Sequence, residues 1–264
     1  MCFKYASVAS GSCGNCHYIG YKNTKILVDA GLSGKKTEEN LNNLDINLEN
    51  TSGILITHEH TDHIKGAGIL SRRYNIPIYA NENTWKVIEN KIGKIKENNI
   101  KVFENNVPFY IEDIKINPFS IHHDAADPVA YTFYNGKNKI SIATDLGYVC
   151  DKIKENIYDS KLVVLESNHD VEMLKMGSYP YYLKKRVLSR KGHLSNEDAG
   201  RFCIELVERG TEKILLAHLS RENNFPELAF ETVKGVLQEK NIHVGKNLEL
   251  SVLKRGKISN LYAV

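Results

Sequence analysis

Six short apolar runs, each ending in a residue that can bind a metal or move a proton, constrain the fold of this chain most. These runs are KILVDAG, GILITH, PFSIHHD, KISIATDLG, KLVVLESNH and KILLAHLS. Apolar, β-branched runs of this length are typical of buried strands, and predicted helices at residues 197–210 and 227–240 alternate with them. In α/β sheets, functional sites collect at the carboxyl ends of strands. Six polar strand ends therefore predict one shared site.

The densest strand end is ILITHEHTDH, which carries His58, His60, Asp62 and His63 within six positions. His58 and His60 are two residues apart, so they point the same way on an extended segment. A helix that begins at residue 63 or 64 would turn Asp62 and His63 toward a neighbouring point. This spacing differs from H-E-x-x-H, which requires a helix. We interpret it as two adjacent metal sites rather than as a cluster of surface or capping residues.

Each metal needs further ligands, which the other strand ends can supply. The candidates are His123, Asp145 and His218. The two oxygens of Asp145 could bind one metal each and so bridge the pair. Imidazole and carboxylate ligands suit two divalent transition metals such as zinc, manganese or iron.

H-x-H-x-D-H after a β-run resembles the signature of the metallo-β-lactamase superfamily, and THEHTDH matches it at every defined position. VDAG, HHDAADP, ATDLG and AHLS are similar to its other motifs, so the resemblance extends from the N-terminus to about residue 225. It implies an α/β fold, the αββα four-layer sandwich, with a dinuclear site at one edge. We expect one domain of this type over residues 1–264.

The resemblance also implies a ligand set. One metal would be held by His58, His60 and His123. The other would be held by Asp62, His63 and His218, with Asp145 bridging. Asp29 would brace the site without binding a metal. His122 is an alternative to His123, but adjacent strand residues point oppositely and the following DA aligns better with His123.

The last third of the chain resembles metal-dependent nucleases of this superfamily. GHLSNEDAG is similar to a motif of the tRNA 3′-end endonucleases, and LES lies where those enzymes place an acidic partner. This implies that His193 contacts the phosphate or donates a proton to the leaving oxygen, and that Glu166 orients His193. With GSYPYYLKKRV and AHLSRENN, the pattern resembles most the YycJ-type (WalJ-like) bacterial nucleases, a branch associated with DNA exonuclease activity and repair. His169 is predicted to support the site, or else to be a buried structural histidine.

A basic segment adjoins His193. No acidic residue lies between Met173 and Asn196, whereas six basic residues do: Lys175, Lys184, Lys185, Arg186, Arg190 and Lys191. Such a cluster suits phosphate contacts, although a solvated basic face is the alternative. The tyrosines of YPYY could stack on bases or could pack internally. We predict that substrate is contacted by Lys184, Lys185, Arg186, Ser220 and Asn223.

We therefore expect a metal-dependent phosphodiesterase, specifically a 5′ to 3′ DNA exonuclease, with DNA favoured over RNA as its partner. A hydroxide bridging the metals would attack phosphorus, and Asp62 would accept its proton. The alternatives are an RNA-processing nuclease, a lactone or cyclic phosphodiester hydrolase, and a non-enzymatic metal-binding module. Only 21 residues separate His123 from Asp145, which leaves no room for the exosite arm of tRNA-processing enzymes. His60 stands where the diiron oxidoreductases typically carry glutamate, which favours hydrolysis.

Composition excludes some classes of protein. A net charge of +3 does not by itself imply nucleic acid, and the longest apolar runs are too short for a membrane span. The five scattered cysteines indicate reduced thiols and a cytoplasmic protein, and the Cys13–Cys16 pair fits a Gly-rich loop better than a redox or zinc site. Ser195 and Asp198 predict a capping box at the start of a helix that Gly210 ends.

Overall fold

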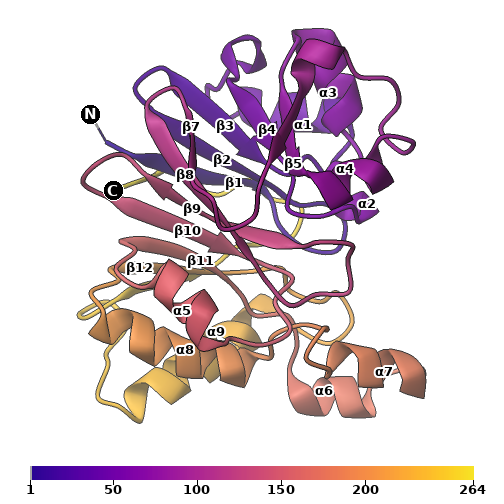
Figure 1. Ribbon diagram of the computed structural model, residues 1–264. Coiled ribbons are helices and arrows are strands. Elements are labelled where there is room, and N and C mark those ends of the chain that lie inside the picture. The colour runs from indigo at the N-terminus through magenta and orange to yellow at the C-terminus, as the bar shows by residue number, and fades with distance from the viewer. Residues whose placement is uncertain (1) are drawn as a thin grey trace.

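The computed structural model describes residues 2–264, which form two seven-stranded sheets packed face to face, with helices on both outer faces (Figure 1). The first sheet has the order β14 (Tyr262–Ala263), β1 (Lys4–Ala9), β2 (Cys16–Tyr21), β3 (Thr24–Val28), β4 (Gly53–Leu55), β5 (Ile78–Asn81) and β6 (Ile100–Phe103). The second has the order β13 (Glu249–Val252), β12 (Lys213–Ala217), β11 (Leu162–Glu166), β10 (Lys139–Ala143), β9 (Val129–Tyr134), β8 (Ile114–Ser120) and β7 (Phe109–Ile111). The predicted αββα sandwich is confirmed.

Helices cover each sheet from outside. The first sheet carries α1 (Gly34–Asn42), α2 (Thr61–Ile64), α3 (Ala67–Tyr74) and α4 (Glu82–Ile88), with short 3₁₀ turns at Leu48–Asn50 and Glu97–Asn99. The second carries α5 (Asp151–Ile157), α8 (Asn196–Glu208) and α9 (Pro226–Gln238), while α6 (Val171–Met176) and α7 (Tyr181–Val187) lie at one corner (Figure 1). In the described range 2–264, no helix combines the length and the apolar character needed to cross a membrane.

Strand alternation divides the interior into three cores. In β3, Leu27 packs toward the helices of the first sheet, whereas Ile26 faces the second sheet. In β11, Val163 packs toward α5 and α8, whereas Val164 faces the first sheet. All four are buried, and complete burial of such a side chain contributes about 1.5–3 kcal/mol. Burial on both faces explains why these strands have near-continuous apolar sequences.

The strand directions bring the polar strand ends to one edge of the sandwich. β3 pairs with β4 in parallel, and β10, β11 and β12 are parallel to one another. β8 is antiparallel to β9, which is antiparallel to β10, so β8 and β10 run in the same direction. Each of the six predicted runs therefore delivers its last residues to the same rim.

Two helix starts can be compared with their predictions. The predicted cap of α8 is confirmed, because the Ser195 side chain accepts a hydrogen bond from the amide of Asp198. The helix expected to begin at residue 63 or 64 instead begins at Thr61, and it breaks before α3. The break occurs at Gly66, whose amide donates to Ala30 O at 2.7 Å and whose Cα packs against the segment at 30–34. This tertiary contact is invisible in the local sequence.

Candidate metal centre

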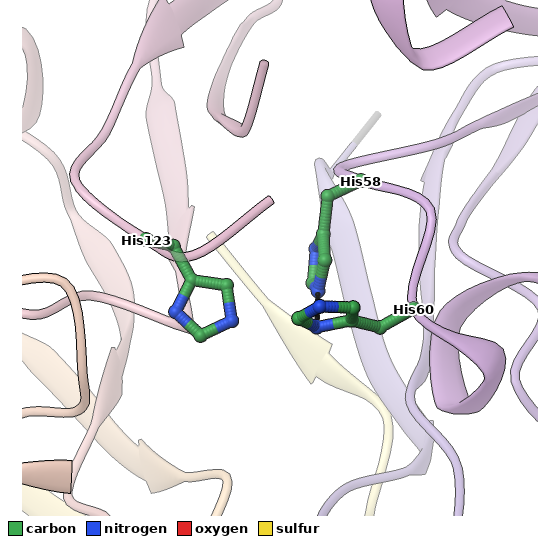
Figure 2. A group of neighbouring side chains, drawn as sticks. All are labelled: His58, His60 and His123. Carbon is green, nitrogen blue, oxygen red and sulfur yellow. Dashed lines mark hydrogen bonds between the residues drawn. The ribbon is translucent and has the colours of Figure 1, made fainter. Parts of the chain in front are cut away.

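The rim of the sandwich holds a compact cluster of imidazole and carboxylate groups. Their potential ligand atoms form four groups that share members, and within each group the ligand atoms all lie within 4.8 Å of one another. The groups are His58, His60 and His123; His58, His63 and Asp145; Asp62, His63 and His218; and Asp145, Glu166, His193 and His218. Figure 2 shows His123 on one side, facing His58 and His60 on the other. All seven predicted metal ligands are thus brought together, and Asp145 belongs to two of the groups.

Four of the histidines are held in the same way through their Nδ1 atoms. The Nδ1 of His63 donates to Asp29 Oδ2 at 2.7 Å, and that of His123 to the Gly192 carbonyl at 3.2 Å. Those of His193 and His218 donate to Glu166 Oε1 at 2.9 and 2.7 Å. Because carboxylates and carbonyls only accept hydrogen bonds, each ring carries its proton on Nδ1 or on both nitrogens. This fixes the orientation of each ring and leaves Nε2 outside these bonds as the potential ligand atom, although on His63 that atom lies 3.0 Å from Asn15 Nδ2.

Several of these atoms are buried without a hydrogen bond. Among residues 2–264, the Nε2 atoms of His123 and His218 and the Oδ2 atom of Asp145 have no hydrogen-bond partner. Buried polar groups are normally paired, and an unpaired one costs roughly 1–3 kcal/mol. A cation coordinated by these atoms would remove that cost, so the cluster fits one or more divalent metal ions.

The electrostatics also favour a cation. Burial would raise the pKa of the Glu166 carboxyl, but the His193 and His218 rings lower it to about 2. Burial would likewise lower the pKa of His218, but the carboxylates of Asp145, Asp62 and Glu166 raise it to about 10. The carboxylates therefore hold positive charge on the rings. Metal ions compete for the same positions with protons, which they displace on binding.

Three residues of the site have left-handed backbones directly after or near a strand end. Their φ angles are +61° at Asp29, +57° at Asp145 and +55° at His218. Few residues other than glycine adopt this region, and Asp and His are among those that do so most readily. The turn directs each side chain away from its strand and toward the cluster. Such conformations gather where the surrounding structure enforces them, as at functional sites.

Asp29 is the anchor beneath the cluster. Its carboxylate is buried and accepts hydrogen bonds from the Thr57 amide at 2.9 Å and the Thr57 hydroxyl at 2.9 Å, besides the bond from His63. It therefore ties the end of β3 to the segment that carries His58, His60 and His63. The structure places Asp29 behind His63, in the position expected for a bracing residue.

Two residues of the site were not predicted from the sequence. Asn15, from the Gly-rich loop, is buried, and its Nδ2 lies 3.0 Å from His63 Nε2 and 3.3 Å from Asp62 Oδ2. Glu59 is also buried, and its Oε1 accepts from the Ala126 amide at 2.8 Å, which joins the His58–His60 segment to the loop of His123. In the sequence, these two residues could have been noticed only because Asn15 lies in a glycine-rich loop and Glu59 lies between His58 and His60.

Four other residues that the sequence analysis considered lie outside the cluster. His122 is exposed and stacks on Tyr148, so His123 is the histidine that faces the cluster. His169 is buried near the site, but neither ring nitrogen forms a hydrogen bond within residues 2–264. Cys13 is exposed and Cys16 is buried, and both are free thiols. The four ligand groups described above contain none of His122, His169, Cys13 and Cys16.

A cavity of 240 Å³ opens onto the cluster. Its walls include His60, Asp62, His123, Asp145, His193 and His218. Three of the predicted substrate contacts, Arg186, Ser220 and Asn223, also line it, whereas Lys184 and Lys185 are not among its lining residues. Arg186 forms an ion pair with Asp124, the residue after His123. The cavity thus places a cationic side chain beside the potential metal positions.

Comparison with known proteins assigns the chain to a family. Residues 24–219 match the β-lactamase superfamily domain. The chain is 46% identical to exodeoxyribonuclease YycJ of Bacillus anthracis, over 95% of both sequences, and 42% identical to exodeoxyribonuclease WalJ of Streptococcus pneumoniae, over 94% of this chain and 93% of the relative. The metallo-β-lactamase fold protein YhfI of Bacillus subtilis has the same fold, with a TM-score of 0.71, 17% identity and coverage of 98% of this chain and 99% of that one. The chain therefore belongs to the metallo-β-lactamase superfamily and, within it, to the family of the YycJ and WalJ proteins.

Proposed function

We propose that this protein is a metal-dependent nuclease that hydrolyses phosphodiester bonds of DNA from a strand end. The observation that carries the proposal is the pairing of His193 with Glu166 at 2.9 Å, beside a cluster suited to metal ions and inside a cavity that Arg186 also lines. A general acid, a cation for phosphate and a metal cluster together suit phosphodiester hydrolysis. The names of the relatives, which are exodeoxyribonucleases, support DNA as the substrate.

Two divalent metals would be held by this cluster. One would lie among His58, His60 and His123, and the other among Asp62, His63 and His218, with Asp145 between them. Nitrogen and oxygen ligands without a thiolate suit zinc or manganese, and also iron. Bound metals would supply positive charge that stabilises the developing charge on the phosphate and increases the acidity of water.

The side chains of the chain then have distinct tasks. His193 uses Nδ1 to donate to Glu166, so its Nε2 can contact the phosphate or protonate the leaving oxygen. Asp62 lines the cavity, and it can accept a proton from the attacking water in addition to binding a metal. Asn15 donates to the Asp62 carboxylate and so fixes its direction. Arg186, Ser220 and Asn223 can contact the substrate backbone.

Digestion of end-labelled DNA tests this function. The purified protein is incubated with duplex DNA labelled at the 5′ or the 3′ end, with matched RNA, and with a small phosphodiester, each with manganese, with zinc and with a chelator. We expect metal-dependent release of nucleotides from DNA and little from RNA. Release of the 5′ label first would establish the expected polarity. Faster cleavage of RNA, or activity on the small phosphodiester alone, would contradict the proposal.

Elemental analysis tests the number of metals independently of activity. Protein reconstituted with excess zinc and then desalted should retain two equivalents. The His218→Ala variant should retain about one, whereas the control variant His243→Ala, which alters an exposed histidine, should retain two. A stoichiometry of one that His218→Ala leaves unchanged would remove the dinuclear assignment.

A further inference from the structure

Helices α6 and α7 and the residues between and just after them, 171–188, form a projection that we call the α6–α7 arm. In Figure 1 the arm extends from one corner of the sandwich, away from α8 and α9. It exposes large side chains to an unusual degree: Met176 is 85% exposed, Tyr181 81% and Tyr182 74%. Clustered exposed apolar groups on a folded domain usually mark a binding surface.

The same arm forms one wall of the cavity. Tyr179, Leu183 and Val187 line it together with His193 and His218. Tyr181 and Tyr182 immediately precede Leu183 in the same helix. Tyr181 and Tyr182 are not among the lining residues, so their exposed rings belong to the outer side of the helix that forms this wall, within reach of a strand that leaves the cavity over α7.

The charge of the arm selects the kind of partner. Within residues 171–188 the arm has four basic residues, Lys175, Lys184, Lys185 and Arg186, and one acidic residue, Glu172; Arg190 and Lys191 follow directly after it. Lys175 pairs with Glu172 and Arg186 with Asp124, but within residues 2–264 Lys184, Lys185 and Arg190 form no ion pair. A surface of exposed aromatic rings among uncompensated cations matches a polyanion with flat apolar groups. A partner with an uncharged, apolar surface would offer no negative charge to pair with these lysine and arginine side chains.

We infer that the α6–α7 arm is a stacking platform for unpaired nucleotides next to the scissile phosphate. Stacking on Tyr181 and Tyr182 requires bases that are not paired, because the faces of paired bases are covered within the duplex. The cavity of 240 Å³ that Tyr179, Leu183 and Val187 line is continuous with the potential metal positions, so nucleotides held on the arm would lie next to the phosphate that is cleaved. This inference rests on the proposed nuclease function and specifies the form of its substrate as a frayed or single-stranded end.

Binding measurements on tyrosine variants test the inference. Fluorescence anisotropy would compare wild type, Tyr181→Ala/Tyr182→Ala and Tyr181→Phe/Tyr182→Phe on a labelled single-stranded oligonucleotide, with calcium as the only divalent ion to limit cleavage. Tyr110→Ala is the matched control, because Tyr110 is 68% exposed but lies on β7, outside the arm and the cavity lining. The double alanine variant should bind at least about 30-fold more weakly, because stacking is lost on both rings. The phenylalanine variant retains both rings and should bind like wild type.

Binding measured at different salt concentrations, and with different forms of DNA, distinguishes the contribution of stacking from that of charge. The loss in the double alanine variant should be similar at low and high salt, whereas the loss in Lys184→Ala/Lys185→Ala should shrink as salt increases, because counterion release drives that contribution. Binding to a relaxed, covalently closed circular duplex, which has neither ends nor loops of unpaired nucleotides, should be the same in the tyrosine variants and in wild type.

Three outcomes would overturn the inference: unchanged single-strand affinity in the double alanine variant, an equal loss in Tyr110→Ala, or a change of oligomeric state in the double alanine variant alone. The last would identify the arm as a contact between copies of the chain. Failure of the nuclease function is distinguishable, since wild type would then degrade no DNA in the metal panel, whatever the tyrosine variants bind.

Discussion

Replacement of Asp29 by asparagine should weaken the binding of one metal and spare the other. The Asp29 carboxylate accepts three hydrogen bonds, two from Thr57 and one from His63 Nδ1 at 2.7 Å. The asparagine amide can still accept from the Thr57 amide and donate to the Thr57 hydroxyl. Its NH₂ group cannot accept from His63, so the ring loses the partner that holds its proton on Nδ1 and its Nε2 toward the cluster.

The size of the effect follows from the role of such a partner. Removal of the group that orients a metal-binding histidine typically costs 10- to 100-fold in metal affinity, or about 1.4–2.7 kcal/mol. The His63 and Asp29 side chains are each only 1% exposed, so water cannot replace the lost acceptor. The ion near Asp62, His63 and His218 should therefore bind more weakly by this factor. The ion near His58, His60 and His123 should be little affected, because Thr57 keeps its bonds.

Competition titration with a chromophoric chelator measures both affinities. Wild type and Asp29→Asn would be titrated with zinc, and a two-site fit should show one weakened and one unchanged constant. Asp113→Asn is a suitable control, because Asp113 pairs with Lys22 at the surface, where an ion pair contributes about 0–1 kcal/mol. Wild-type affinity at both sites in Asp29→Asn would refute the argument, as would equal weakening of both.

Three further predictions concern neighbouring groups. Asp62→Ala should lower kcat on a small phosphodiester by roughly 100- to 10,000-fold at saturating metal, with an unchanged circular dichroism spectrum, whereas near-normal turnover would exclude its role as proton acceptor. Glu59→Ala should reduce zinc affinity about tenfold in the chelator assay, and Glu59→Gln, which can still accept from the Ala126 amide, should restore it. Burial lowers the pKa of His169 from 6.5 to about 4, so between these values the unfolded chain binds a proton that the folded chain does not. Stability should therefore fall by up to about 3 kcal/mol as pH decreases from 6.5 to 4, and denaturant unfolding of His169→Asn should show a correspondingly flatter pH dependence than wild type.

The sequence by itself determined which strands are buried and where the reactive side chains stand along them. Apolar runs such as KILVDAG and KLVVLESNH are local patterns, and burial on both faces is the reason for their composition. The convergence of their ends was predictable because parallel strands place their carboxyl ends at one edge. The cap at Ser195 was predictable because it depends on residues only three positions apart.

Only the tertiary structure decided which side chains meet across that edge. Glu166 accepts from both His193 and His218, which lie 27 and 52 residues away in sequence, and Asn15 reaches His63 across 48 residues. No periodicity records such pairings, because they depend on how strands and sheets are placed and not on the local chain. The break at Gly66 and the exposed tyrosines of the α6–α7 arm have the same origin. Whether a side chain is buried or presented to a partner depends on what packs against it, and that is a property of the assembled fold.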